Sequence, residues 1–365
     1  MNKVVTFILA GGKGERLFPL TKDRAKPAVP FGGIYRIIDI TLSNCINSGI
    51  RRIHVLIQYK SISLQRHLRQ GWNIFNSELG EYIDVIPAQQ RVGSNWYQGT
   101  ADAIFQNIYT IEQEKPDEVL ILAGDHIYKM DYLAMLDFHR RNKADMTVAV
   151  IEMDKSMSQN FGVIETDGSK KVLGFQEKPK NPKTIPSKQG MIYASMGIYV
   201  FNTSALKDEL TEDSEKISTH DFGKDVIPQM IRKKRKVVSY NFKDENKNKS
   251  PYWRDIGTLD AYYEANMDLI QVSPIFNLYD IEWPIRTYQE QFSPAKTVFA
   301  GDENPERMGL VLDSLISGGC IVSGGRVQRS ILSPNVRINS YSEVYDSILM
   351  EGVNVGRYAK IRRAI

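Results

Sequence analysis

The sequence predicts an α/β domain with a mostly parallel sheet, followed by a parallel β-helix. Up to about residue 150, short apolar runs alternate with amphipathic stretches. This alternation is typical of a parallel sheet with helices on both faces. From residue 309 onward, apolar side chains instead recur every six positions, with Gly and Ser between them. A period of six is typical of the hexapeptide coils of a β-helix.

Each apolar run in the first part is expected to be a strand, and each amphipathic stretch a helix. Strands are predicted at 4–10, 52–57, 82–87, 118–123 and 146–152. Helices are predicted at 39–48, 61–70, 100–113 and 132–142, with later ones at 221–232 and 259–270. Between 161 and 201 strands dominate, at 161–164, 172–176 and 193–201, and this insertion could form one wall of a ligand pocket.

The C-terminal part is divided into a linker and a repeat region. Residues 273–308 contain four prolines and little periodicity, so they are predicted to be a linker. The β-helix is expected over 309–365. Its three series of apolar residues are Leu315, Ile321 and Val327; Leu332, Ile338, Val344 and Met350; and Leu349, Val355 and Ile361. A β-sandwich is the alternative, but it rarely keeps one period across three series. Because the chain stops within a coil, this domain is expected to be incomplete at its C-terminus.

The composition argues against several classes of protein. The 365 residues are enough for two domains, and 47 Lys and Arg against 43 Asp and Glu leave a net charge of only +4, so no nucleic-acid partner is expected. The basic run 232–236 is predicted to be a solvated helix end rather than an anion or membrane patch. Cys45 and Cys320 lack metal-like spacing and are expected to be reduced thiols of a cytoplasmic protein. With no signal peptide and no long apolar stretch, no membrane partner is expected.

The first strand leads into a glycine-rich turn with the features of a phosphate site. Its run ends in Gly-Gly-Lys-Gly-Glu-Arg at 11–16, and Lys26 follows ten residues later. Glycines let the backbone turn tightly and present amide hydrogens to an anion, while Arg and Lys hold phosphate oxygens. A dinucleotide-binding fingerprint would need Gly at Leu17, and a Walker A loop would need Gly-Lys-Ser/Thr. A surface turn with solvated cations is the simpler alternative, but the combination predicts a triphosphate site.

Two carboxylates from distant segments are candidate metal ligands. Asp125 directly follows the strand 118–123, at the edge where ligands of parallel sheets bind. Asp255 precedes a helix that Thr258 could cap, and an extra capping group is its alternative role. Mg²⁺ commonly takes one or two carboxylates together with substrate phosphates, so the pair indicates Mg²⁺. His126 could be a general base, but phosphate substrates need no deprotonation, so a structural role is expected.

Further segments carry candidate ligand-binding residues. Lys178 follows a strand and could bind a phosphate, and Ser195 offers a hydroxyl among small residues. Gly99 would let a base or ribose approach closely, and Thr100 is a candidate helix N-cap. The amide of Gln89 could recognise a base edge. Each also has a plain structural explanation, as a strand-end cation, part of a buried strand or a satisfied loop amide.

Together these segments resemble the sugar-phosphate nucleotidyltransferases, and most closely the glucose-1-phosphate adenylyltransferase family, over essentially the whole chain. The matching motifs lie at 11–16, 24–29, 43–48, 87–91, 96–103, 123–128, 175–179, 194–199, 220–225 and 252–258, and 323–363 resembles the family's β-helix. The resemblance implies a catalytic domain over 1–272 with a Rossmann-like mixed sheet, then the linker and a left-handed parallel β-helix.

The resemblance also implies an activity: transfer of the adenylyl group of ATP to glucose 1-phosphate, giving ADP-glucose and pyrophosphate for glycogen- or starch-type glucan synthesis. Arg16 and Lys26 would hold the triphosphate, and Asp125 and Asp255 would hold Mg²⁺. The residues implied to contact ATP are Leu9, Gly11, Gly12, Gly14, Gln89, Tyr97, Gly99 and Thr100. Those implied to contact glucose 1-phosphate are Gly162, Glu177, Lys178, Ser195 and Asp221.

The family also implies a homotetramer and regulation by phosphorylated metabolites. Many bacterial members carry a Lys after a Phe-Gly-Gly segment, where this chain has Ile34, so a weak or altered response to fructose 1,6-bisphosphate is predicted. A non-catalytic regulatory subunit is one alternative, but all the residues implied to be catalytic are present. An acyltransferase is another, although the repeat region contains no His. Spacing alone leaves a different nucleotide or sugar open.

Overall fold

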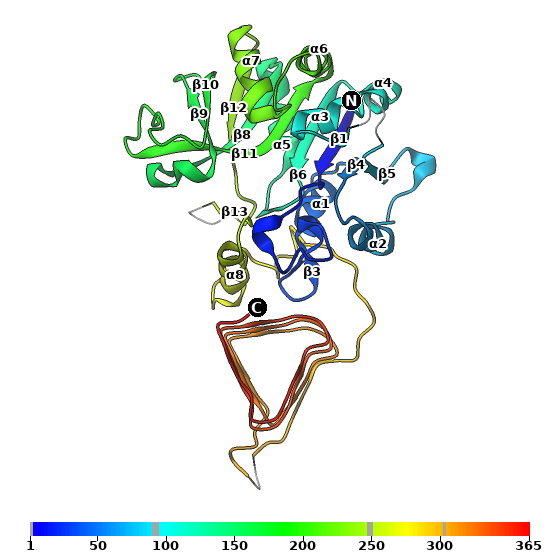
Figure 1. Ribbon diagram of the computed structural model, residues 1–365, viewed down its shortest axis with the longest axis vertical. Coiled ribbons are helices and arrows are strands. Elements are labelled where there is room, and N and C mark those ends of the chain that lie inside the picture. The colour runs from blue at the N-terminus through cyan, green and yellow to red at the C-terminus, as the bar shows by residue number, and fades with distance from the viewer. Residues whose placement is uncertain (1–2, 90–94, 247–250, 302–303) are drawn as a thin grey trace.

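In the computed structural model, the chain forms an upper α/β domain and a lower, triangular β-helix (Figure 1). The structure describes residues 3–89, 95–246, 251–301 and 304–365. Gln90 and Arg91, which belong to the matching motif 87–91, lie outside these ranges. Within the described residues, no helix combines the length and the apolar character needed to cross a bilayer.

The α/β domain is built on a nine-stranded mixed sheet. Its strands are β1 (Val4–Leu9), β4 (Arg52–Ile57), β5 (Tyr82–Pro87), β6 (Glu118–Ala123), β8 (Met146–Asp154), β9 (Gly162–Thr166), β10 (Val172–Glu177), β11 (Met191–Asn202) and β12 (Val237–Asn241). The main path runs β10-β9-β11-β6-β1-β4-β5, and β8 joins β11 to β12. Pairing is parallel around β1 and between β8 and β12, whereas β11 is antiparallel to its neighbours. The predicted mostly parallel, mixed sheet is confirmed.

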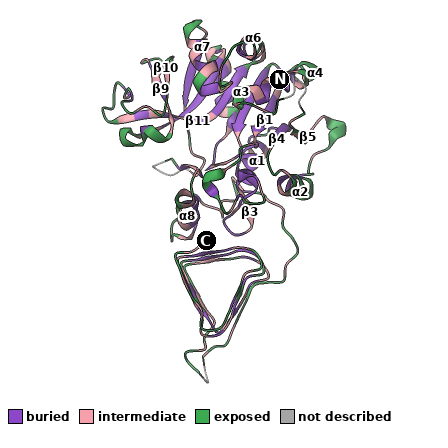
Figure 2. Ribbon diagram, in the orientation of Figure 1, coloured by how far each residue is buried: buried purple, intermediate pink, exposed green. Residues whose placement is uncertain are grey.

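Strand β1 lies at the centre of the sheet and is buried on both faces. Val5, Phe7 and Ile8 have no exposed surface, which explains why its sequence is continuously apolar rather than alternating. Buried residues follow the central strands in Figure 2, while exposed ones gather on outer helices and loops. Strand β1 pairs with β6 so that Leu9 lies opposite Ala123. The segments that follow these two strands therefore leave the same edge of the sheet, side by side.

The helices mostly follow the predicted ranges, except that α6 (Thr203–Ser214) was not predicted. The helices are α1 (Ile37–Asn47), α2 (Ile62–Gly71), α3 (Thr100–Phe105), α4 (Ile108–Glu114), α5 (Tyr132–Asn142), α6 (Thr203–Ser214), α7 (Ile227–Arg232) and α8 (Leu259–Met267). The shorter helical turns are η1 (Glu15–Leu17), η2 (Lys26–Ala28), η3 (Ser77–Leu79), η4 (Lys155–Asn160), η5 (Phe222–Val226) and η6 (Asp268–Ile270). Two small sheets pair β2 (Pro30–Phe31) with β3 (Tyr35–Arg36), and β7 (His126–Tyr128) with β13 (Trp253–Asp255).

The helix predicted over 100–113 is in fact two helices, α3 and α4. The side-chain amide of Asn107 donates to the carbonyl oxygen of Ala103 at 2.7 Å, and the backbone N–H of Asn107 bonds to Ile104 instead. An Asn side chain that takes the carbonyl four residues earlier competes with the helical ladder. Hydrophobic periodicity continues across such a break, so the pattern did not reveal it.

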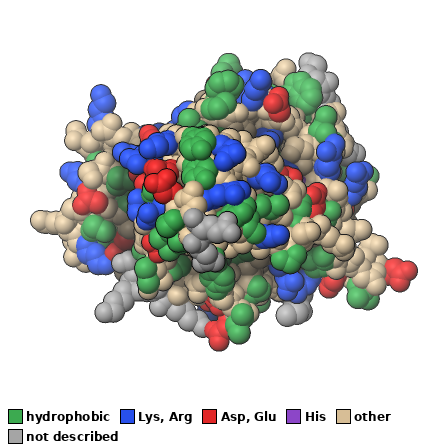
Figure 3. All heavy atoms as spheres, turned by 90° about the horizontal axis from the view of Figure 1, so that it is seen from below, with side chains coloured by type: hydrophobic (Ala, Val, Ile, Leu, Met, Phe, Trp, Pro, Cys, Tyr) green, Lys and Arg blue, Asp and Glu red, His purple; other side chains and the backbone are tan. Residues whose placement is uncertain are grey.

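Three stacks of parallel strands form the sides of the β-helix, as the repeat predicts. The stacks are β14 (Lys296–Val298), β17 (Ile321–Ser323), β20 (Arg337–Ile338) and β23 (Asn354–Val355); β15 (Leu310–Leu312), β18 (Arg326–Gln328), β21 (Glu343–Tyr345) and β24 (Lys360–Arg362); and β16 (Leu315–Ile316), β19 (Ile331–Leu332) and β22 (Ile348–Leu349). Strand β14 lies inside the predicted linker 273–308, so the stacking begins before residue 309. Viewed from below, the molecule shows Lys and Arg side chains among apolar and acidic ones (Figure 3).

The corners of the β-helix shift the strict period of six. Gly324, Tyr341 and Tyr358 turn equivalent corners with φ between 62° and 70°, and they are 17 residues apart rather than 18. The coils between these corners are therefore one residue short of 18. As a result Val322, not Ile321, fills the β-helix core. The predicted core residues Leu315 and Met350 pack against the α/β domain instead.

The side of the β-helix that carries β16, β19 and β22 packs on the α/β domain. Ile331 and Ile348 belong to the same hydrophobic cluster as Ile40 of helix α1. The hydroxyl of Tyr263 in α8 donates to the carbonyl oxygen of Asp346 at 2.8 Å. The two domains are therefore held together by buried apolar surface as well as by the segment that links them.

The basic run 232–236 is mostly exposed at the end of helix α7 (Ile227–Arg232), as predicted, and two of its cations also form ion pairs with helix α6. Lys233 Nζ lies 2.8 Å from Oε2 of Glu209, and Arg235 Nε lies 3.1 Å from its Oε1. Glu209 is fully buried, and a buried carboxylate needs such partners. Lys233 and Arg235 are therefore the ion-pair partners of the buried Glu209 carboxylate.

His139 of helix α5 is expected to make stability depend on pH. Burial lowers the pKa of His139 to about 4, whereas an unfolded His titrates near 6.5. The folded protein thus keeps a neutral ring that the unfolded chain protonates. The stabilisation is complete above the unfolded pKa. It is lost as pH falls toward the folded value, by up to about 1.4 kcal/mol per pH unit. Urea unfolding between about pH 7 and pH 5 should show this slope, and His139→Gln should flatten it; an unchanged slope in the variant would contradict it.

Candidate active site

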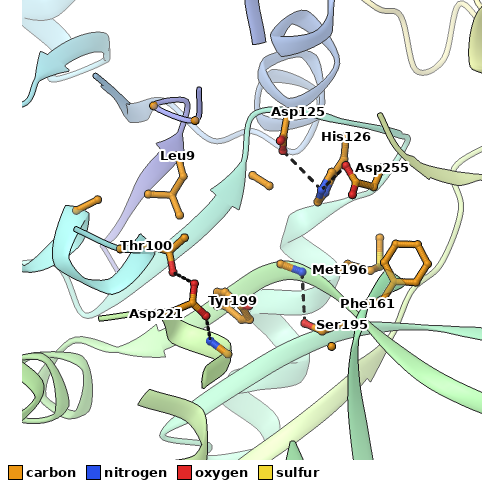
Figure 4. Close-up of a pocket in the computed structure, with 18 of the residues that line it drawn as sticks. Leu9, Thr100, Asp125, His126, Phe161, Ser195, Met196, Tyr199, Asp221 and Asp255 are labelled. Carbon is orange, nitrogen blue, oxygen red and sulfur yellow. Dashed lines mark hydrogen bonds and ion pairs between the residues drawn. The ribbon is translucent and has the colours of Figure 1, made fainter. Parts of the chain in front are cut away.

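A cavity of about 540 Å³ opens at the carboxyl ends of β1 and β6. The predicted site residues that line it are Leu9, Gly11, Gly12, Tyr97, Gly99, Thr100, Asp125, Gly162, Glu177, Lys178, Ser195, Asp221 and Asp255. Among the described residues, Gly14, Arg16, Lys26 and Gln89 were also predicted but are not part of this lining. Two groups of polar side chains face each other across the cavity (Figure 4).

One group is an acidic pair bridged by a lysine. Asp125 follows β6 directly, and antiparallel pairing of β13 with β7 places Asp255 opposite His126. Lys26, in turn η2, places its Nζ 2.8 Å from Oδ2 of Asp125 and 3.0 Å from Oδ1 of Asp255. Three segments far apart in the sequence therefore meet at one point of the sheet edge.

Lys26 and Asp125 stabilise each other's charged form. Burial alone would lower the pKa of Lys26, but Asp125 and Asp255 outweigh it, and the pKa is raised. Burial alone would likewise raise the pKa of Asp125, and Lys26 together with His126 lowers it. Lys26 and Asp125 are thus both charged near neutral pH.

The residues present suit a divalent cation. Oxygen atoms of Asp125 and Asp255 and a ring nitrogen of His126 all lie within 4.8 Å of one another. His126 Nε2 is 3.5 Å from Asp125, and its ring packs edge-on against Trp253, with centroids 5.1 Å apart. Mg²⁺ prefers oxygen ligands, so the carboxylates are its candidate ligands and His126 a neighbour that orients Asp125.

The glycine-rich turn packs onto this cluster. Gly14 has φ of 66°, and a Cβ there would lie 3.0 Å from Cβ of Lys26, so a side chain would push Lys26 away. Arg16 lies near Asp255: a Cβ at Gly257 would be 3.1 Å from Arg16 Nη2 and 3.4 Å from Asp255 Oδ2. Gly14 and Gly257 therefore let Lys26 and Arg16 approach the acidic pair closely.

The second group links helix α3 to residues 220–223. Thr100 is the first residue of α3 rather than its N-cap, which is Gly99. The Thr100 hydroxyl donates to Oδ2 of Asp221 at 3.0 Å and accepts from the backbone N–H of Phe222. A Cβ at Gly99 would clash with the carbonyl oxygens of Thr219 and His220. The close approach predicted at Gly99 is thus made by protein backbone.

The ring of Phe175 fills the space that two glycines leave open. A Cβ at Gly162 would overlap the ring tip, and one at Gly223 would lie 2.7 Å from Cζ. Asp221 Oδ1 accepts from the backbone N–H of Gly223 at 2.9 Å, so the same turn fixes the carboxylate. The ring forms part of the cavity wall beside Asp221.

At the sugar-phosphate site that the resemblance implies, Gly162→Ala is expected to raise KM for that substrate by about tenfold, with kcat little changed. The new methyl group would overlap the Phe175 ring and displace it, and this ring forms part of the cavity wall. Gly168→Ala is the matched control, because a Cβ there meets nothing within 4 Å. Initial rates measured against each substrate separately would contradict this if both variants behaved alike.

The remaining predicted residues belong to neither of these two polar groups. Lys178 has φ of 46° and a half-exposed side chain, with Nζ 3.8 Å from Glu177. Ser195 lies where the β11–β8 register shifts, and its Oγ accepts from the Gly197 N–H at 3.4 Å. Tyr97 accepts a hydrogen bond from Asn107, and burial raises its pKa. Gln89 is exposed after β5 and is not brought to the cavity.

The sequence analysis missed several apolar and aromatic wall residues. Phe161, Met196, Tyr199 and Trp253 line the cavity. One of them had a usable signal: Trp253 lies two residues before Asp255 on β13, and side chains two apart on a strand share a face. Burial raises the pKa of Tyr199, and Asp221 adds to this. The ring therefore stays neutral as a hydrogen-bonding group of the wall.

Comparison with known proteins agrees with this geometry. A model of the nucleotidyl transferase family matches residues 5–272, and a GlmU-like C-terminal hexapeptide model matches 293–365. Glucose-1-phosphate adenylyltransferase of Koribacter versatilis is 56% identical over the whole chain, which covers 87% of that relative. The enzymes of that name from Rhodopirellula baltica and Methylococcus capsulatus are 54% and 52% identical, with 82% and 85% of their lengths covered.

The fold and the site thus define a nucleotidyl transferase. Within that class, the chain belongs to the glucose-1-phosphate adenylyltransferase family.

Proposed function

We propose that the chain transfers the adenylyl group of ATP to α-D-glucose 1-phosphate, giving ADP-glucose and pyrophosphate for glycogen-type glucan synthesis. The observation that carries this is Lys26 Nζ held between Asp125 and Asp255, two carboxylates that line the cavity. The names of the relatives supply the two substrates. A site with fixed cations and carboxylates suits a reaction between two anions, in which positioning and charge neutralisation dominate.

In the proposed mechanism, an oxygen of the sugar phosphate attacks the α-phosphorus in line with the departing pyrophosphate. Arg16 and Lys26 hold the triphosphate and stabilise the charge that develops on the leaving group. The amide hydrogens around Gly11 and Gly12, which line the cavity after Leu9, bind phosphate oxygens. No covalent intermediate is needed, because the nucleophile is already ionised.

Asp125 and Asp255 are proposed to hold Mg²⁺, which would polarise the α-phosphate and neutralise phosphate charge. His126, whose ring nitrogen lies 3.5 Å from Asp125, helps to orient that carboxylate. Lys26 keeps the two carboxylates together before the substrates bind, so the pair does not spread through mutual repulsion.

The opposite wall is proposed to bind glucose 1-phosphate. Lys178 binds its phosphate, while Glu177, Ser195 and Asp221 accept or donate hydrogen bonds to the sugar hydroxyls, next to the backbone of Gly162. Asp221 is held ready by three donors, from Thr100, Gly223 and Lys224. Tyr97 and Gly99, which also line the cavity, are proposed to shape the nucleotide side, with Gly14 supporting Lys26.

The experiment that tests this function is a set of initial rates with ATP, UTP, dTTP and GTP, each supplied with glucose 1-phosphate and Mg²⁺. Rates with ATP should exceed the others by about tenfold or more. A clear preference for another nucleotide would assign a different product, and no product with any of them would favour a non-catalytic subunit.

We also propose a cytoplasmic homotetramer regulated by phosphorylated metabolites, as the family implies. Both cysteines are buried free thiols, as expected for a reducing compartment.

Ile34 lines a second cavity of about 280 Å³ at the domain junction, together with Arg36 and Glu351. An apolar Ile34 offers no charge to a bisphosphate, so weak activation by fructose 1,6-bisphosphate is expected in the same rate assay. Strong activation would reject this.

A further inference from the structure

Helix α1 buries more polar side chains than its own folding requires. Asp39, Thr41, Ser43 and Asn44 are all fully buried. Burying a polar side chain costs free energy unless it makes a hydrogen bond. Apolar side chains at these positions would pack the buried face of the helix without that cost. The partners of these side chains therefore indicate what the helix holds in place.

The partners fall on two faces of the helix. On one face, Asp39 accepts from Thr287, Ser43 accepts from the backbone N–H of Arg286, and Asn47 donates to the carbonyl oxygen of Pro284. These contacts fasten the segment that leads to the β-helix. On the other face, Thr41, Asn44 and Ser48 are spaced i, i+3 and i+7. They bond the backbone between residues 123 and 132, which includes Asp125.

The second face holds both ends of the segment that carries Asp125. The hydroxyl of Thr41 donates to the carbonyl oxygen of Ala123 at 3.0 Å. One turn later, Asn44 Nδ2 donates to the carbonyl oxygen of Tyr128 at 3.0 Å, and its Oδ1 accepts from the N–H of Met130 at 3.3 Å. Ser48 then accepts from the N–H of Tyr132.

This anchoring matters because strand β7 does not belong to the main sheet. Strands β7 and β13, of three residues each, form a two-stranded sheet of their own. Such a pair is marginal without further support. Its register places Asp255 opposite His126, so a shift of β7 would move both carboxylates relative to Lys26.

Asn44 also connects this strand to the segment entering the β-helix. The indole N–H of Trp283 donates to Asn44 Oδ1 at 2.8 Å. Next to it, the buried Lys129 places its Nζ 2.7 Å from the carbonyl oxygen of Asn277 and 3.1 Å from Asp280. The end of β7 is thus fixed from two sides by groups outside the cavity.

We propose that Thr41 and Asn44 are positioning residues for the transfer: from outside the cavity, they fix the backbone on both sides of Asp125 and so set the distance between the two carboxylates. This inference rests on the proposed function of the acidic pair. Small displacements of a catalytic group cost large factors in rate, so removing one anchor should lower kcat more than substrate affinity.

The test compares Thr41→Val, which removes the hydroxyl at equal size, with Thr41→Ser, which keeps it. Thr41→Val is expected to lower kcat by about tenfold or more, with KM for both substrates changed less than about threefold and the half-saturating Mg²⁺ concentration raised. Thr41→Ser should restore most of the rate. Asn44→Leu should behave like Thr41→Val. If Asn44→Leu does not fold, the comparison of Thr41→Val with Thr41→Ser tests the proposal without it.

Ser43→Ala is the matched control, because it removes an equally buried hydroxyl from the other face of α1. Its kcat should stay within about twofold of the wild type. Hydrogen exchange provides a readout independent of activity: Thr41→Val and Asn44→Leu should expose amides in 123–130 and 253–256, and Ser43→Ala should not. Equal kcat for Thr41→Val and Thr41→Ser, or an equal loss in Ser43→Ala, would overturn the proposal. If the wild type forms no ADP-glucose, the proposed function fails instead, and the exchange data alone decide the anchoring.

Discussion

Asp255→Asn is expected to lower kcat by about 10²- to 10³-fold while the protein stays folded. Asn keeps the shape of the side chain and an oxygen that can still accept from Lys26, so the β13–β7 pairing should survive. It removes the negative charge that a divalent cation requires. Initial rates over a range of Mg²⁺ concentrations should therefore show both a lower plateau and a shift to higher Mg²⁺.

Asp260→Asn is the control for this substitution. Asp260 is an exposed carboxylate in the first turn of α8, five residues further along. Its replacement should leave both the rate and the Mg²⁺ dependence unchanged. A rate for Asp255→Asn within about fivefold of the wild type would remove Asp255 from the catalytic centre.

Lys26→Met is expected to lower kcat/KM for ATP by about 10³-fold. The substitution leaves two carboxylates facing each other without their shared cation, and it removes one of the charges proposed to stabilise leaving pyrophosphate. The pKa of Asp125, which Lys26 holds low, should rise. The loss should appear both in ADP-glucose synthesis and in the reverse reaction with pyrophosphate, since both directions share one transition state.

Lys13→Met separates this effect from a general loss of positive charge. Lys13 lies in the same glycine-rich turn, but its side chain is more than half exposed. Thermal unfolding of both variants should show that Lys26→Met is still folded at the assay temperature. A similar loss of rate in Lys13→Met would mean that net charge near the turn, rather than the bridge between the carboxylates, carries the effect.

Much of the fold was predictable because it depends on periodicity. The ranges of β4, β5, β6 and α5 follow directly from apolar patterns. The break between α3 and α4 was not predictable, because the side chain of Asn107 makes it without disturbing the apolar pattern. The six-residue repeat indicated the β-helix but not its 17-residue coil, because the shortening shows only where the corners lie.

The residue types of the site were predictable, but their connections were not. The sequence indicated Lys26 and Asp125 separately, as a phosphate ligand and a metal ligand. Only the structure shows that Lys26 bridges Asp125 and Asp255, because these residues lie about 100 and 230 positions apart in the sequence. Similarly, Thr100 was assigned to the nucleotide, whereas it bonds Asp221 on the proposed sugar side. Long-range contacts of this kind leave no local pattern.

The measurement that tests the central claim most directly is quantification of products from the wild-type chain with ATP and glucose 1-phosphate, before and after removal of divalent cations. The account predicts ADP-glucose and pyrophosphate in equal amounts, no product after chelation, and recovery when Mg²⁺ is restored. A folded wild-type protein that forms no ADP-glucose with Mg²⁺ present, or one that keeps its full rate without divalent cations, would contradict it.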